Sequence, residues 1–163
     1  MKKIALLILL FLGLCVEASS QVQVAWDGPV GVDIIFKRCY VAGNQCILDF
    51  VIANNTTKDI KSFSTSHHPL RPIAFDDEGN NYEYVYGANN MFSNAECMIG
   101  GKKLGEVISI PAGVSVKAHM VITSFDEYAT LITLYRHEFS FMYNNIHMYP
   151  KRVEFRNIPV ARE

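Results

Sequence analysis

The chain has 163 residues, 50% of them hydrophobic, and its 15 Lys and Arg nearly balance its 16 Asp and Glu. This length is typical of one domain. The near-neutral charge excludes a polybasic nucleic-acid-binding protein and an acidic solvating tail, because both mechanisms need an excess of one charge. No self-similar period occurs, which argues against a solenoid or a propeller.

The N-terminal segment has the pattern of a secretory signal peptide. A basic start precedes an apolar run at 4–16, and the small residues Ala18 and Ser20 stand at positions −3 and −1 of a cut. The run is shorter than the roughly 20 apolar residues of a membrane-spanning helix, and no second such run follows. We therefore expect a signal peptide at 1–20 and an exported domain, periplasmic or secreted, at 21–163 without a transmembrane segment.

A second interpretation of this segment is lipidation at Cys15. Residues 12–15 resemble the cleavage motif of bacterial lipoproteins, in which the modified cysteine follows a small residue. Here the preceding residue is Leu14. We therefore favour cleavage after Ser20 over a lipid anchor at Cys15.

The composition of the mature chain favours β structure. From residue 21 onward there are 13 Val and 13 Ile but only 5 Leu, and 18 residues are aromatic. β-branched and aromatic side chains suit a pleated, half-buried surface, whereas a helical domain would be richer in Leu and Ala. This balance predicts an all-β protein.

Two hairpins are predicted in the first half of the mature chain. Strands at 30–37 and 46–53 flank a turn at 43–44. The second of these strands is a dense apolar run, typical of a central strand that is covered on both faces. A further hairpin joins 72–75 to 82–86 through acidic and glycine residues that suit a turn.

The second half of the mature chain adds further short strands. Residues 87–105 lack alternation and are expected to form an irregular loop. The predicted strands that follow are 106–110, 114–122, 130–136, 139–143 and 152–158. About seven to nine strands with turns between them describe a single antiparallel β-sandwich.

Four segments carry a resemblance to a known group of proteins. In chain order they are VDIIFKRCYVAGNQCILDFVIANNTTKDI, IAFDDEGNNY, IPAGVSVKAHMVI and VEFRNIPV. With them the chain resembles the small secreted immunoglobulin-like β-sandwich proteins of Bacteroidetes-type bacteria, which are largely uncharacterised. The resemblance covers nearly the whole mature chain. It implies an immunoglobulin-like sandwich and export, and it transfers no catalytic residue.

Three cysteines follow the signal segment. Cys39 and Cys46 lie on the two arms of the first hairpin, so we predict a disulfide between them in an oxidising compartment. Cys97 is then either a buried thiol or the partner that replaces one of the other two. Three buried, reduced cysteines are the alternative. No base partner is placed beside any of them, which argues against a catalytic cysteine.

An aromatic strip is the candidate ligand-binding surface. Tyr82, Tyr84 and Tyr86 recur with a period of two and share one strand face. On an exported sandwich such a strip can stack on sugar rings or contact a partner protein. The core is the alternative location, but three hydroxyls are hard to satisfy in a dry core. A similar strip at 139–143 is expected to face the core.

No pattern of metal ligands is present. The three consecutive acids at 76–78 diverge along the chain and indicate a turn rather than a calcium loop. His67 and His68 are adjacent, the other three histidines are scattered, and no H-E-x-x-H motif occurs. We expect neither a metal nor a cofactor.

These features favour a non-enzymatic, exported binding or interaction module whose partner is a glycan, a peptide or a cell-surface protein. One alternative is a secreted hydrolase that folding would assemble from the available histidines and acids, Asp33, Asp49, Asp76, Asp77 and Glu96. Another is a structural subunit of a surface assembly that uses an edge strand at 153–158. The charges of Arg152, Glu154 and Arg156 oppose strand exchange there.

Overall fold

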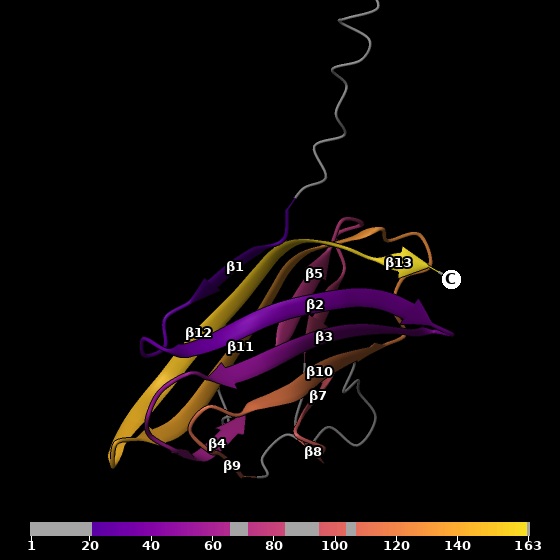
Figure 1. Ribbon diagram of the computed structural model, residues 1–163. Helices are drawn as coiled ribbons and strands as arrows, with labels where there is room; N and C mark the ends of the chain where they lie inside the picture. The colour runs from indigo at the N-terminus through magenta and orange to yellow at the C-terminus, as the bar shows by residue number, and fades with distance from the viewer. Residues whose placement is uncertain (1–20, 66–71, 84–94, 104–106, 163) are drawn as a thin grey trace, which may run out of the picture.

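The computed structural model describes residues 21–65, 72–83, 95–103 and 107–162. These residues form strands but no helix, and therefore no helix that is long and apolar enough to span a membrane. The strands belong to two sheets that pack face to face around one apolar core (Figure 1). The predicted all-β sandwich is confirmed. The predicted signal peptide at 1–20 lies outside the described residues.

The first sheet, called sheet A here, contains the longest strands. Its main path runs β1 (Gln23–Trp26), β12 (Ile146–Pro159), β11 (Leu131–Tyr143), β4 (Ile60–Thr65) and β9 (Ile108–Ile110). β5 (Ile73–Asp76) pairs with the other half of β11 and with β6 (Asn81–Glu83). All these pairs are antiparallel. The predicted hairpin around 76–80 is therefore confirmed as β5–β6.

The second sheet, sheet B, lies in front of sheet A in Figure 1. Its order is β13 (Ala161–Arg162), β2 (Val32–Ala42), β3 (Gln45–Asn54), β10 (Ser115–Thr123), β7 (Ala95–Ile99) and β8 (Lys102–Lys103). β13 is parallel to β2, and the remaining pairs are antiparallel. The hairpin predicted through residues 43–44 is confirmed as β2–β3. Its turn includes Gly43 with a φ of 64°, a conformation that glycine adopts without strain.

The core is formed by side chains that alternate along the strands. Phe50 of β3 lies between Tyr135 and Phe155 of sheet A, with ring centroids 6.3 and 5.8 Å apart. On β10, Ala118, Met120 and Ile122 alternate with outward residues and are buried. Phe139 and Phe141 are buried as predicted. Burial of one such aromatic side chain contributes about 1.5–3 kcal/mol, so these rings dominate the packing.

Trp26 connects β1 to both sheets. β1 pairs with β12 of sheet A, yet the indole Nε1 of Trp26 donates to the carbonyl oxygen of Val32 in sheet B, 2.7 Å away. The ring also stacks on Phe141. The backbone of Gly28 lies so close that a Cβ atom there would be 2.0 Å from the ring. A glycine is needed at position 28 because only a residue without a side chain leaves room for the indole.

Several sequence-based predictions of strands are wrong. The strands predicted at 130–136 and 139–143 are one continuous strand, β11, since the polar residues between them are accommodated within it. The predicted loop at 87–105 contains β7 and β8. The predicted edge strand at 153–158 belongs to the C-terminal half of β12, an inner strand that pairs with β11 on one side and, over 153–156, with β1 on the other. The described residues form thirteen strands rather than seven to nine, because several pair over only two to four residues.

Candidate functional site

The structure places Tyr82 in the core. Its side chain is 3% exposed, and its hydroxyl donates to Asp76 Oδ2 over 2.6 Å and accepts from the backbone N–H of Asp126. Burial and the bond to Asp76 raise the pKa of the Tyr82 hydroxyl. Tyr84 and Tyr86 lie outside the described residues. The ligand-binding strip therefore stays a prediction, and the one member that is described faces inward.

Asp76 is the centre of the β5–β6 turn. Its carboxylate accepts from the backbone N–H of Asn80 at 2.8 Å and from Asn80 Nδ2 at 2.9 Å, in addition to Tyr82. The same Nδ2 lies 3.1 Å from Asp126 Oδ2. Asp77 points elsewhere and accepts from Thr130. The acids diverge as the sequence predicts, and each of these two carboxylates accepts hydrogen bonds that hold the turn.

The other candidate catalytic residues are dispersed. Asp33 accepts from Asn55 Nδ2 at 2.8 Å, and Asp49 pairs with Arg38. The side chain of Glu96, together with His67 and His68, lies outside the described part of the structure. Within the described ranges, no three His, Cys, Asp or Glu side chains gather in a way that could hold a metal ion.

Cys39 and Cys46 face each other inside sheet B. Both are buried, and their Sγ atoms lie 3.4 Å apart as free thiols. The hydrogen bond to Cys46 and burial raise the pKa of the Cys39 thiol. The side chain of Cys97 lies outside the described atoms. The two sulfur atoms are close enough for the predicted disulfide to form after a small rotation, and the disulfide stays a prediction.

The outer surface of sheet A carries paired charges. Arg136 Nε lies 2.8 Å from Glu154 Oε1, and Arg156 Nη2 lies 3.1 Å from Glu154 Oε2. Burial would raise the pKa of Glu154, but these hydrogen bonds outweigh it and lower the pKa. Arg152 pairs in the same way with Glu138 at 2.9 Å. The charges that the sequence suggested as protection of an edge strand are instead compensated on an ordinary solvent-facing surface.

The outer surface of sheet B is different, because apolar side chains recur on it. Ile34 is buried while the next residue, Ile35, is 41% exposed, and the half-buried Ile47 and Val51 alternate with core residues of β3. None of the described strands packs on this side. We call this surface the open face; it consists of Ile35, Arg38, Tyr40, Ile47, Asp49, Val51, Lys117, His119 and Val121.

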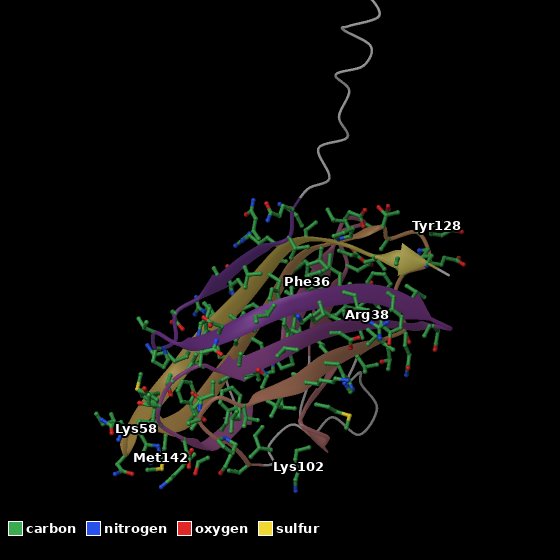
Figure 2. The ribbon with its side chains drawn as sticks, in the orientation of Figure 1. Phe36, Arg38, Lys58, Lys102, Tyr128 and Met142 are labelled. Atoms are coloured by element: carbon green, nitrogen blue, oxygen red, sulfur yellow. The ribbon has the colours of Figure 1, made fainter. Side chains whose placement is uncertain are left out.

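Arg38 occupies the middle of the open face (Figure 2). Its guanidinium lies over the Tyr40 ring, 4.6 Å from the centroid, and its Nε is 2.7 Å from Asp49 Oδ2. The strand register places His119 beside Asp49 on the next strand. An ordered arginine with an aromatic neighbour, surrounded by aliphatic side chains, is the composition found at the centres of protein interfaces.

The open face was not identified from the sequence, because a dense apolar run has two explanations: a strand covered on both faces, or a strand with an apolar outer face. We expected the strand at 46–53 to be covered on both faces, yet Ile47 and Val51 are only half-buried. The available signal was Ile35, an apolar residue on the outward side of an otherwise alternating strand. Together with the outward aliphatic residues of the next strand, it indicates an apolar outer surface.

Comparisons with family models and with curated proteins found no match. Among solved structures, the chain is similar to the "X-ray structure of Northeast Structural Genomics Consortium target SoR45". The two share 13% sequence identity with a TM-score of 0.32, over 82% of this chain and 86% of that chain. A similarity of this size carries no information about function.

Proposed function

We propose that this protein is an exported, non-enzymatic interaction module that binds a cell-surface protein through the open face. The observation that carries the proposal is the difference between the two outer surfaces. Sheet A exposes compensated charges, whereas sheet B exposes aliphatic side chains around Arg38 and Tyr40. Apolar surface costs free energy in water unless a partner covers it.

The composition of the open face suits a protein partner. Ile35, Ile47 and Val51 provide apolar area that is removed from water when a partner binds. Arg38 is already held by Asp49 and Tyr40, so little side-chain entropy is lost when it enters an interface. The fold itself does not decide the function, and the proposal depends on this surface.

Cross-linking in cells that make the protein tests the open face. A photo-reactive amino acid at Ile35 or Val51 is expected to form an adduct of one defined larger mass. The same amino acid at Gln23 or Arg156, which pair on the outer surface of sheet A, is the matched control and should give none. With the partner in hand, Ile35→Lys should weaken binding by about tenfold or more, because a charge is buried in the contact. Equal adducts from both surfaces, adducts with copies of this chain only, or none would contradict the proposal.

Export is the second part of the proposal and depends on the pattern at 1–20. It is supported by the resemblance to secreted immunoglobulin-like sandwich proteins of Bacteroidetes-type bacteria. We expect the intact mass of the native protein to correspond to a chain that begins at Gln21. Without a reducing agent, Cys39 and Cys46 should resist alkylation after denaturation, and Cys46→Ser should make Cys39 reactive. An unprocessed chain would contradict export. A lipid-modified chain beginning at Cys15 would show that the protein is anchored to a membrane by lipid.

A further inference from the structure

A polar cleft separate from the open face lies at the end of the sandwich where the β3–β4 loop meets the β11–β12 hairpin. Its volume is about 320 Å³. Figure 2 shows Lys58 and Met142, which both line the cleft, near each other at this end of the molecule. The residues that matter for its chemistry are Lys58, Asp59, Lys61, Met142, Asn144 and Asn145. The volume is near the lower limit for ligand-binding clefts, which are about 300–1,000 Å³, and therefore indicates a small ligand.

One wall is a tight turn. Asn144 and Asn145 connect β11 to β12 and have φ angles of 53° and 60°. Two successive left-handed residues are typical of a type I′ hairpin turn, in which Asn is favoured. The turn fixes the backbone positions of both exposed residues at the rim of the cleft. Met142, just before the turn, is opposite Lys61 of β4 in the strand register.

The other wall is held in place by a buried side chain. Asn54 is fully buried, and its Nδ2 donates to the carbonyl oxygens of Lys58 and Ile110, both at 2.9 Å. Its Oδ1 accepts from Thr56 Oγ1 at 2.7 Å. The loop that carries Lys58 is therefore tied to the core before any ligand arrives. Such preorganisation reduces the entropy lost on binding.

The charges of the cleft are not balanced internally. Among the described residues, neither Lys58 nor Lys61 has a hydrogen bond or ion pair from its ammonium group. Asp59 is committed through Oδ1 to the backbone N–H of Ala112, 3.0 Å away. Two ammonium groups and one tethered carboxylate give the cleft a net charge of about +1, which attracts an anion.

We infer that this cleft binds a small hydroxylated carboxylate, such as a uronic acid residue of an acidic polysaccharide. Lys58 and Lys61 donate to the ligand carboxylate, because charge-assisted hydrogen bonds are the strong ones available. The amides of Asn144 and Asn145 both donate and accept, so they match the hydroxyl groups of a sugar ring. Met142 provides an apolar contact for the C–H face of the ring.

The carboxylate of Asp59 narrows the class of ligand. It repels a dianion such as sulfate more strongly than a monoanion, and its remaining lone pairs accept hydrogen bonds from ligand hydroxyls. A neutral sugar leaves the two ammonium groups without a counter-charge. A monoanion that also carries hydroxyls satisfies all these groups together. This site is separate from the open face and does not depend on the function proposed for it.

Titration of the purified protein with galacturonic acid, followed by NMR chemical shifts, tests the inference. We expect saturable shifts at Lys58, Lys61, Asn144 and Asn145. Galactose, the neutral analogue, should bind about tenfold or more weakly. Lys58→Gln and Lys61→Gln should each weaken binding by about tenfold, the effect of removing one charge-assisted hydrogen bond.

Lys37→Gln is the control, because Lys37 is exposed on β2 in sheet B, away from the cleft. It should bind galacturonic acid as the unmodified protein does and show the same fold by amide spectra. Equal binding of galactose and galacturonic acid would overturn the inference, as would unchanged binding by both cleft variants or equal shifts with inorganic phosphate. The absence of saturable shifts would also overturn it while leaving the open-face proposal intact.

Discussion

Lowering the pH from 7 to 3 is expected to remove about 4 kcal/mol of the free energy of unfolding through the lowered pKa of His137. This residue is fully buried on β11 beside Phe139, with ring centroids 4.4 Å apart. Burial lowers its pKa from 6.5 to about 3. The unfolded chain takes up a proton below pH 6.5 while the folded protein does not, so stability falls as pH drops from 6.5 towards 3.

His137 is held neutral by its surroundings. Its Nδ1 lies 2.8 Å from the Tyr135 hydroxyl, and among the described residues its Nε2 has no hydrogen-bond partner. A proton on Nε2 would therefore be buried without a counter-charge or an acceptor. This environment explains why the charged form is disfavoured so strongly.

Urea unfolding at pH 7, 6, 5, 4 and 3 measures the effect. The single tryptophan, Trp26, reports the loss of packing between β1 and the two sheets. The comparison is with His137→Phe, which keeps an aromatic ring but cannot bind a proton. Protonation of carboxylates with lowered pKa values, such as Glu154, also lowers the free energy of unfolding in acid. This contribution is the same in both proteins. Parallel pH profiles for the two proteins would show that His137 is not responsible.

Replacement of Asp76 by Ala is expected to cost about 4 kcal/mol of stability. The carboxylate is buried and accepts from the Tyr82 hydroxyl and from both N–H groups of Asn80 that reach it. Its removal leaves the buried Tyr82 hydroxyl and the part-buried backbone N–H of Asn80 without an acceptor, at a cost of about 1–3 kcal/mol each, while Asn80 Nδ2 keeps Asp126. It also leaves a small cavity beside the Tyr82 hydroxyl.

The matched control is Glu78→Ala, an exposed acid in the same turn, which should change stability by less than about 0.5 kcal/mol. Tyr82→Phe should fall between the two, since it removes one donor and keeps the ring against Phe125. Chemical denaturation of the three variants at pH 7 gives the ranking. An Asp76→Ala protein as stable as Glu78→Ala would show that the turn network does not stabilise the fold.

The local features of the fold were predictable from the sequence, and the pairing between distant strands was not. Alternating Val and Ile residues and turn signals such as Gly43 identify the β2–β3 and β5–β6 hairpins. The polar residues His137 and Glu138 suggested a break in β11. Only the distant partners, Arg152 for Glu138 and the core aromatic rings for His137, explain why the strand continues.

The candidate sites depend on the same long-range information. To identify the open face, one must know that none of the described strands covers Ile47 and Val51. The alternation of residues along a strand does not reveal this. The cleft joins Lys58 to Asn144, residues that only the pairing of β4 with β11 brings together. Tyr82 shows the reverse case. Its hydroxyl was expected to be awkward in a core, and a buried aspartate that no spacing rule identifies accepts its hydrogen bond.

The first and last described strands, β1 and β13, form one edge of each sheet. β1 is held by β12, and β13, which follows β12 directly, is held by β2. A chain that is made from its N-terminus therefore carries β1 unpaired, and the outer edge of β2 at Tyr40 and Val41 uncovered, until residues 146–162 have been added. Pairing between the ends also gives a high contact order, which slows folding and lengthens the time in which strand edges are exposed. Completion of both sheets thus waits for residues 146–162, and removal of this segment would weaken both layers together.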